Sequence, residues 1–421
     1  MSNDDVAVLQ AGDKRVELPL TEATEGNSGY GISSLMKETG NTTLDPGFTN
    51  TASCVSRITF IDGDQGILRY RGYPIDDLAE NSHFLEVCYL VIHGELPSSA
   101  ELEEFEQRIL AERKVHEDVK NLFSAFPRST HPMAILSAGI MVLESYAQDT
   151  VAVRDEKQVE AATVRMLAQV PTLAAYIFRH VTGQEFIEPD LELGYVENFL
   201  RMCFGDSVEE SQVKAMDTLF VLHAEHEQNC STSTVRLVGS ADTNLYASVA
   251  AGVNALWGPR HGGANQAVLE MLNAIKDSDN DTATFMEKVK KKEDGVKLMG
   301  FGHRVYKNYD PRATIVKKHT DEILASTDNE LLDIAKGLEE VALNDDYFKS
   351  RKLYPNVDFY TGLIYEAFGF PMNYFTVLFA LGRLPGWIAQ WREMMTDPDN
   401  KIGRPRQVYI GETERKYQKQ A

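Results

Sequence analysis

Apolar residues recur at helical spacing along most of this 421-residue chain, from about residue 76 to about residue 395. Side chains three and four positions apart share one face of a helix, so this pattern predicts a series of amphipathic helices. Pro171 and Pro385 lie inside apolar stretches, and a proline in a helix interior removes a backbone hydrogen bond. We therefore expect helices to end before each of these prolines, and we predict a mainly α fold.

Strand signals are confined to the first 70 residues. Residues 6–18 contain two short alternating stretches, and residues 57–70 predict two strands joined by a turn that contains Asp-Gly. Residues 21–50 are rich in Gly, Thr and Asn, which is typical of a loop. The sequence thus predicts a small N-terminal β segment over residues 1–70.

The chain carries 42 basic and 63 acidic residues, so its formal charge is −21. This charge argues against nonspecific binding to nucleic acid or to an anionic membrane, but a local group of arginines can still bind a small anion. The four cysteines form no CxxC pair, no apolar signal segment is visible, and no apolar run reaches the about 18–20 residues that span a bilayer. We expect a cytoplasmic protein with neither nucleic acid nor a membrane as partner.

Residues 257–265, Trp-Gly-Pro-Arg-His-Gly-Gly-Ala-Asn, surround His261 with one proline and three glycines. This composition resists helix and strand and lets a ligand approach the imidazole closely. The next residues predict a helix, so His261 lies just before a helix N-terminus, whose positive dipole end disfavours imidazolium. We therefore expect His261 to be neutral and able to donate a hydrogen bond.

Other segments also interrupt the helical pattern with polar residues. They are residues 223–229 with His223 and His226, residues 300–312 with His303 and Arg312, residues 356–362 with Asp358, Arg383 at an expected helix end, and Arg404 in the tail. Taken singly, each has a structural explanation: a helix cap for Asp358, helix carbonyls for Arg383, and a hydrogen-bonded pair or a metal site for the two neighbouring histidines. Only their combination indicates chemistry.

Arginines bind carboxylates through paired hydrogen bonds, so three arginines in apolar surroundings indicate a substrate with several carboxylates. An aspartate with the ordinary pKa of about 3.9 is a weak base. It can remove a carbon-bound proton only if a placed donor stabilises the enolate, and a neutral histidine supplies such a donor. A second histidine can polarise an acceptor carbonyl. The set fits carbon–carbon bond formation between an enolised donor and a keto acid.

Five segments resemble the bacterial branch of the citrate synthase family: WGPRHGGAN, GFGHRVYKNYDPR, NVDFYTG, KIGRPRQVYIG and LHAEHEQNCSTSTVR. The resemblance runs from about residue 6 to residue 411. It implies that Asp358 abstracts the methyl proton of acetyl-CoA and that His261 hydrogen-bonds the thioester oxygen. His303 would polarise the oxaloacetate carbonyl and protonate the new alkoxide. One departure is Glu225, where the family commonly has aspartate.

The resemblance also implies the binding residues. His226, Arg312 and Arg383 would bind the carboxylates of oxaloacetate and citrate, and Arg404 would reach into the neighbouring subunit's site. Contacts to coenzyme A would come from Met299, Gly300, Phe301, Gly302, Lys307 and Asn356. No metal and no cofactor are implied, since acetyl-CoA is a substrate.

The family fold implies a multi-helical protein of two domains with the N-terminal β segment. We expect a discontinuous large domain over residues 71–263 and 371–421, and a small helical domain over residues 264–370. The resemblance implies a homodimer at least, and the β segment resembles that of members that form hexamers.

Three alternatives remain open from the sequence. A 2-methylcitrate synthase would use propionyl-CoA with the same residues, since one extra methylene changes binding by only about 1–3 kcal/mol. A metal-dependent hydrolase could use His223, His226, His261 and His303 as ligands. A non-catalytic helical scaffold is the third alternative.

Overall fold

The computed structural model describes residues 6–278, 281–324 and 329–418. It divides into two compact units, one made of the residues up to Val55 together with those from Gly403 onward, and the other of residues Ser56–Ile402. The two units are described separately below.

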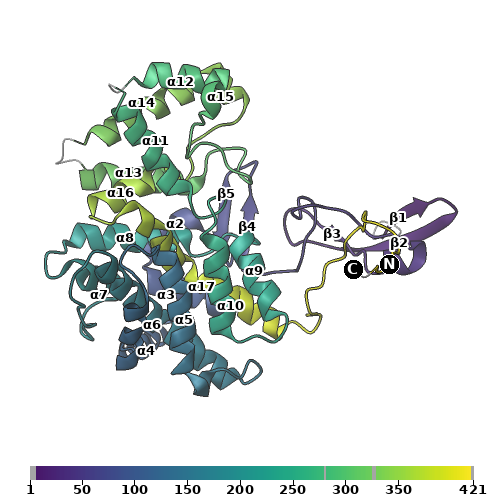
Figure 1. The fold of residues 1–421 in the computed structure, drawn as a ribbon, viewed down its shortest axis with the longest axis horizontal. Coiled ribbons are helices and arrows are strands. Elements are labelled where there is room, and N and C mark those ends of the chain that lie inside the picture. Colours follow the sequence, from purple (N-terminus) through teal and green to yellow (C-terminus); the bar gives the residue numbers. More distant parts are fainter. Residues whose placement is uncertain (1–5, 279–280, 325–328, 419–421) are drawn as a thin grey trace. The chain divides into compact units, whose positions relative to one another are not determined.

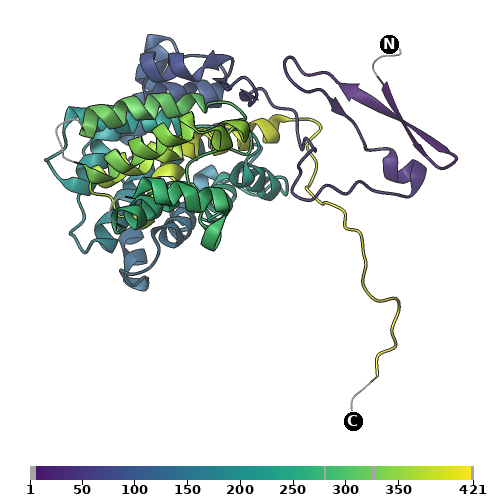
Figure 2. The same ribbon diagram turned by 90° about the horizontal axis from the view of Figure 1, so that it is seen from above.

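The first unit contains a small antiparallel sheet (Figures 1 and 2). Strand β1 (Val6–Ala11) pairs with β2 (Lys14–Thr21), and β2 pairs with the short β3 (Gly29–Tyr30). Val16 and Leu18 of β2 are buried with Leu35 of helix α1 (Leu35–Thr39). The predicted strands near the N-terminus are therefore confirmed. The tail from residue 403 to residue 418 forms neither helix nor strand (Figure 2).

The second unit begins with a β-hairpin. Strand β4 (Thr59–Asp62) pairs antiparallel with β5 (Ile67–Tyr70), and β6 (Tyr73–Pro74) extends the sheet. Leu68 and Tyr70 of β5 point into the core, where they are 2% and 0% exposed. The two strands predicted over residues 57–70 are thus confirmed.

Helices form the rest of the second unit, as the apolar periodicity predicts. In chain order they are α2 (Ile75–Asn81), α3 (Phe84–His93), α4 (Ser99–Ala111), α5 (Pro132–Ser145), α6 (Glu156–Val181), α7 (Tyr195–Phe204), α8 (Glu210–His223), α9 (Cys230–Gly239), α10 (Leu245–Leu256), α11 (Ala264–Lys276), α12 (Thr282–Lys291), α13 (Pro311–Leu324), α14 (Glu330–Asn344), α15 (Asp346–Ser350), α16 (Asp358–Ala367) and α17 (Phe375–Thr396). Short 3-10 turns are η1 (Glu117–Ala125), η2 (Gln148–Thr150), η3 (Glu293–Gly295) and η4 (Met372–Tyr374). The mainly α fold is confirmed.

Two helix ends that the sequence predicts are wrong. Helix α6 continues through Pro171, and helix α17 continues through Pro385. A proline in a helix interior costs about 3 kcal/mol, but each large apolar side chain buried on folding contributes about 1.5–3 kcal/mol. Trp387 and Ile388, just after Pro385, are both fully buried. Packing along the whole helix therefore outweighs the local preference, and Arg383 lies inside α17 rather than at its end.

Helix α17 runs through the middle of the second unit and packs against α3, α8, α9 and α10 (Figure 1). Close approach to the end of α8 depends on Gly382 and Gly386. A Cβ atom at Gly386 would lie 2.2 Å from the carbonyl oxygen of Ala224, and one at Gly382 would lie 2.9 Å from Cβ of His223. Two segments that carry predicted site residues are thereby held side by side.

Helix α6 is 26 residues long and meets the length and composition of a membrane-spanning helix. However, 83% of its apolar window is buried inside the protein, as in the core helix of a globular domain.

Helices α11 to α16 gather at one end of the second unit (Figure 1). The division into a large domain and a small domain with boundaries at residues 264 and 370 stays a prediction.

Candidate active site

The loop after helix α8 brings His226 to His303. His226 is 8% exposed, its Nε2 atom lies 3.2 Å from the hydroxyl oxygen of Tyr306, and its ring centroid lies 5.3 Å from that of His303. Burial, followed by the positive charge of Arg312, lowers the pKa of His226 well below its ordinary value. Two histidines that are far apart in the sequence thus form one neutral pair.

Backbone groups fix the orientation and tautomer of His303. Its Nδ1 atom accepts hydrogen bonds from the N–H groups of Val305 and Tyr306, at 3.1 and 3.3 Å. A neutral imidazole that accepts at Nδ1 carries its proton on Nε2. Burial, and then Arg312, lowers the pKa of His303 to about 4. At neutral pH this residue is therefore an uncharged donor through Nε2.

His261 is held by Ser231, at the start of helix α9. The backbone N–H of Ser231 donates to Nε2 of His261 at 3.2 Å, and the hydroxyl oxygen lies 2.8 Å from the same atom. Because Nε2 accepts from a backbone N–H, the neutral ring carries its proton on Nδ1. Burial, and then Arg383, lowers the pKa of His261 to about 4. This supports the neutral ring that the sequence predicts, but burial rather than the dipole of helix α11 is the main cause.

Asp358 is the first residue of helix α16, and its carboxylate is not a helix cap. Its Oδ1 atom is buried without a hydrogen-bond partner, while its backbone N–H donates to Oδ1 of Asn356 at 3.0 Å. Burial raises the pKa of Asp358 to about 6, although the charges of Arg312 and Arg383 oppose this rise. The carboxylate is therefore a stronger base than an aspartate with the ordinary pKa.

Arg312 and Arg383 are both buried, but in different ways. Arg312 is 3% exposed and forms a two-point ion pair with Asp310, with Nε–Oδ1 and Nη2–Oδ2 distances of 3.0 and 2.9 Å. Arg383 is 2% exposed and donates through Nε to the carbonyl oxygen of His223 at 2.6 Å. Its Nη1 atom is buried without a hydrogen-bond partner, and no ion pair to it is present in the described part of the chain. A buried guanidinium with a nitrogen atom that lacks a hydrogen-bond partner is suited to bind an anionic ligand.

The carbonyl that Arg383 contacts ends helix α8. Contact with a helix carbonyl, which the sequence analysis gave as the structural explanation for this arginine, is present, but the helix is α8 and not its own. Burial lowers the pKa of Arg383 to about 10, so it remains charged at neutral pH.

Of the residues expected to contact coenzyme A, Gly300, Phe301 and Gly302 lie against the segment of Pro355 and Asn356. The backbone N–H of Asn356 donates to the carbonyl oxygen of Gly300 at 2.9 Å, and its side-chain amide donates to that of Gly302 at 3.0 Å. Phe301 forms an isolated β-bridge with Pro355. A Cβ atom at Gly300 would lie 2.7 Å from a methyl carbon of Val268, so this strand-like contact requires glycine there.

Met299 continues this segment, with its backbone N–H 3.3 Å from the sulfur of Met271. Lys307 is exposed, and its ammonium group donates to the carbonyl oxygen of Arg304 at 3.1 Å. Arg404 belongs to the first unit, so its predicted place at the site stays a prediction.

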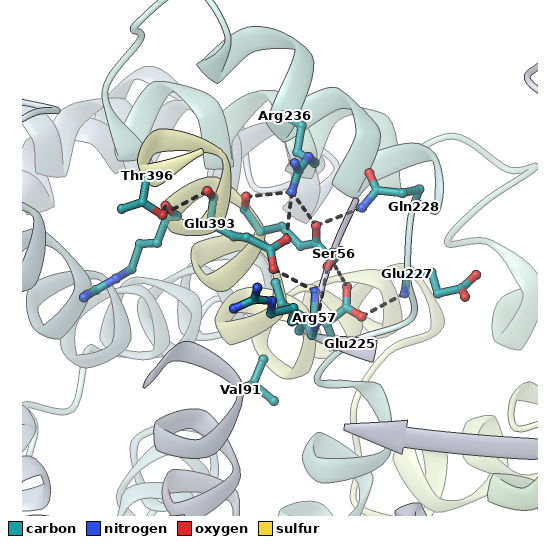
Figure 3. A network of polar contacts seen from close by, with 12 residues as sticks. Ser56, Arg57, Val91, Glu225, Glu227, Gln228, Arg236, Glu393 and Thr396 are labelled. Carbon is teal, nitrogen blue, oxygen red and sulfur yellow. Dashed lines mark hydrogen bonds and ion pairs between the residues drawn. The ribbon is translucent and has the colours of Figure 1, made fainter. Parts of the chain in front are cut away.

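Glu225 is fully buried beside the site, in a network that Figure 3 shows. Its carboxylate accepts from the backbone N–H of Glu227 at 2.8 Å and from Nε2 of Gln390 at 3.2 Å. The amide oxygen of Gln390 in turn accepts from Arg236 at 2.9 Å and from Gln228 at 2.8 Å. The longer side chain of Glu225 is therefore accommodated through Gln390 of helix α17.

Two residues of the site, Ser231 and Tyr306, were not singled out from the sequence, and His223 was named there without its role in the core. His223 donates through Nδ1 to the carbonyl oxygen of Leu219 at 2.7 Å, and its Nε2 is buried without a partner. The sequence indicates His223 only as a possible metal ligand or as part of a hydrogen-bonded pair with His226, while nothing in the sequence marks Ser231. Within residues 6–278, 281–324 and 329–418, no three His, Cys, Asp or Glu side chains are grouped as metal ligands.

Comparisons with known proteins agree in pointing to one family. A family model described as citrate synthase, C-terminal domain, matches residues 47–406. Citrate synthase 1 of Mycobacterium tuberculosis is 60% identical over 421 residues, which cover 98% of each chain. Citrate synthase of Corynebacterium glutamicum is 56% identical over 422 residues, covering 99% of this chain and 97% of the relative.

Solved structures agree with these sequence matches. Citrate synthase from Pyrobaculum aerophilum matches with a TM-score of 0.81 and 32% identity, over 98% of this chain and 96% of the other. Citrate synthase from Thermoplasma acidophilum, solved in a ternary complex with carboxymethyl coenzyme A and oxaloacetate, matches with a TM-score of 0.83 and 30% identity, over 90% of this chain and 98% of the other.

Proposed function

The chain belongs to the citrate synthase family, and from this premise we propose that it condenses acetyl-CoA with oxaloacetate and water to give citrate and coenzyme A. The observation that carries the proposal is the buried, unpartnered carboxylate oxygen of Asp358. Such a group is placed to take a proton from a bound substrate rather than to stabilise the fold.

Enolisation would be the first step. Asp358, with its pKa raised to about 6 by burial, takes a proton from the methyl group of acetyl-CoA. The C–H bonding electrons move into the new carbon–carbon double bond, and the thioester oxygen gains negative charge. The Nδ1–H group of neutral His261 stabilises that oxygen by donating to it.

Condensation would follow at the keto carbonyl of oxaloacetate. The Nε2–H group of His303 donates to this oxygen, and the enol carbon attacks the polarised carbon. The new alkoxide takes the Nε2 proton of His303, which gives citryl-CoA and leaves a deprotonated ring. Water then cleaves the thioester to a carboxylate and the thiol of coenzyme A, and the proton released in this step restores His303. Asp358 returns its proton to solvent, and citrate and coenzyme A leave.

The carboxylates of oxaloacetate would be bound by His226, Arg312 and Arg383. Arg383 supports this role most directly, because its buried Nη1 atom lacks a hydrogen-bond partner. The segment from Met299 to Gly302 would bind coenzyme A together with Asn356, and the exposed Lys307 would meet a phosphate.

The complete enzyme would be a cytoplasmic homodimer at least, with the hexamer as the alternative, and Arg404 would enter the partner's site. We expect no metal and no cofactor in the reaction. Sedimentation of the purified protein measures the assembly: a monomer that retains full activity would overturn the shared site.

A thiol-release assay tests the proposed reaction. Oxaloacetate is held at saturation, acetyl-CoA and propionyl-CoA are varied, and each series is repeated after exhaustive chelation. We expect a higher kcat/KM for acetyl-CoA and no effect of the chelator. A higher kcat/KM for propionyl-CoA would favour the 2-methylcitrate reaction, and loss of activity on chelation would favour the metal-dependent hydrolase.

A further inference from the structure

The turn between strands β4 and β5 lies directly against the loop that carries His303. The backbone N–H of Lys307 donates to the carbonyl oxygen of Gly63 at 2.7 Å. A Cβ atom at Gly63 would lie 2.1 Å from the carbonyl oxygen of Val305, and one at Gly66 would lie 2.7 Å from that of Tyr309. The contact is therefore between two backbones, and it leaves no room for a side chain at either glycine.

The turn has a defined shape of its own. The carboxylate of Asp62 accepts from the backbone N–H groups of Asp64 and Gln65, at 3.0 and 2.9 Å, and from the side-chain amide of Gln65 at 2.8 Å. An aspartate that binds the following N–H groups stabilises a tight turn. Because β5 is anchored in the core by the fully buried Tyr70, the turn presents a fixed surface to the loop.

One peptide group connects this contact to His303. The carbonyl oxygen of Val305 faces Gly63, and the N–H of Tyr306, in the same peptide plane, donates to Nδ1 of His303. A peptide group is planar and rigid, so a rotation that moves its oxygen also moves its N–H. Displacing the oxygen from Gly63 would therefore disturb the hydrogen bond that fixes the tautomer of His303.

We propose that the β4–β5 turn is a positioning element for His303, in which Gly63 keeps the Val305–Tyr306 peptide in the orientation that aims Nε2–H of His303 at the keto carbonyl. This inference rests on the proposed function. Gly63 acts through the loop and touches no substrate, so it is a positioning residue rather than a catalytic one.

The variant Gly63→Ala tests the proposal, with Gly194→Ala as its matched control. Neither glycine has a left-handed backbone, but a Cβ atom at Gly194 meets nothing closer than 3.8 Å. The main readout is the infrared stretching frequency of the keto carbonyl in bound oxaloacetate, which a hydrogen-bond donor lowers. The other readouts are kcat and the dissociation constant of oxaloacetate.

We expect Gly63→Ala to move the carbonyl frequency toward its value in free solution. The same variant should lower kcat by about 10- to 100-fold, which is less than the full contribution of a positioned general acid, because His303 is displaced but not removed. The dissociation constant of oxaloacetate should change less than about threefold, because Arg312 and Arg383 are untouched. Gly194→Ala should leave all three quantities unchanged. A purely structural role would lower the melting temperature of Gly63→Ala without moving the carbonyl frequency, and that result would overturn the proposal.

Asp62→Ala provides a second variant if Gly63→Ala does not fold. It removes the hydrogen bonds of an exposed carboxylate without adding a clash, so we expect a smaller carbonyl shift in the same direction. An unchanged frequency in this variant would count against the positioning role. Failure of the proposed function looks different, because the wild-type protein itself would then release no thiol from acetyl-CoA with oxaloacetate.

Discussion

Replacing Asp358 with asparagine should stabilise the protein while it abolishes most of the turnover. The pKa of Asp358 is raised from 3.8 to about 6, chiefly by burial. The folded protein therefore retains a proton that the unfolded chain has lost between these two pH values. The free energy of unfolding falls as the pH rises through this window and stays lower above it, because the ionised carboxylate is buried away from water.

The size of this effect follows from the shift. One pKa unit corresponds to about 1.4 kcal/mol, so a shift of about two units costs the folded state about 3 kcal/mol above pH 6. The amide of asparagine resembles the protonated carboxyl group in size and polarity. The free energy of unfolding of Asp358→Asn should therefore be about 3 kcal/mol higher than that of the wild type at pH 8 and almost the same at pH 4. At pH 8 this difference corresponds to a rise of a few degrees in melting temperature.

Activity should change in the opposite direction. Removing the base should lower kcat by about 10²- to 10⁴-fold, the usual contribution of a placed general base. The affinity for oxaloacetate should stay nearly unchanged, because Arg312 and Arg383 bind its carboxylates. Thermal melts at both pH values, thiol release and oxaloacetate titration measure these three quantities.

Asp217→Asn is the matched control. Burial also raises the pKa of Asp217 to about 6, but its carboxylate accepts from the backbone N–H of Phe84 at the start of helix α3. It should show a pH-dependent change in stability with unchanged turnover. A loss of stability in Asp358→Asn at both pH values, or equal losses of affinity and turnover, would refute the reasoning.

Further predictions concern the other charged groups and the helix contact. The value of kcat/KM should fall as the pH drops through about 6, where Asp358 gains a proton. His261 and His303, with pKa values of about 4, should cause no loss of activity above pH 5. A pH–rate profile checks both expectations. Arg383→Leu should raise the KM for oxaloacetate at least about tenfold, since it removes a buried charged donor, and steady-state kinetics measure the change. Gly386→Ala should lower the melting temperature, because its Cβ atom would meet the carbonyl oxygen of Ala224 at 2.2 Å. If the site is shared, mixed dimers of inactive Arg404→Ala and Asp358→Asn subunits should regain activity after joint refolding, and no recovery would contradict a shared site.

Much of the fold could be predicted because it depends on local periodicity. The alternating residues of β4 and β5 and the apolar spacing of the helices are visible in the sequence. Pro171 and Pro385 misled the prediction, because the packing that keeps α6 and α17 continuous comes from distant parts of the chain. Burial of this kind cannot be derived from neighbouring residues alone.

The candidate site shows the same limit. His261, His303 and Asp358 were found because glycine, proline and charge interrupt the helical pattern around them. The roles of Ser231 and Gly63 were not found from the sequence. Ser231 matters through its contact with His261, and Gly63 through its contact with the loop that carries His303. The neutral state of His261 was predicted from a helix dipole, but its main cause is burial, which only the folded structure reveals.

The most direct test of the central claim is isotope tracing of the products. The protein is supplied with oxaloacetate and acetyl-CoA that is labelled with ¹³C in its methyl carbon, and the products are identified by mass spectrometry. We predict that labelled citrate and free coenzyme A form in equal amounts and that Asp358→Asn forms almost none of either. Labelled acetate in place of citrate would show that the thioester is simply hydrolysed, and it would contradict the proposed formation of a carbon–carbon bond.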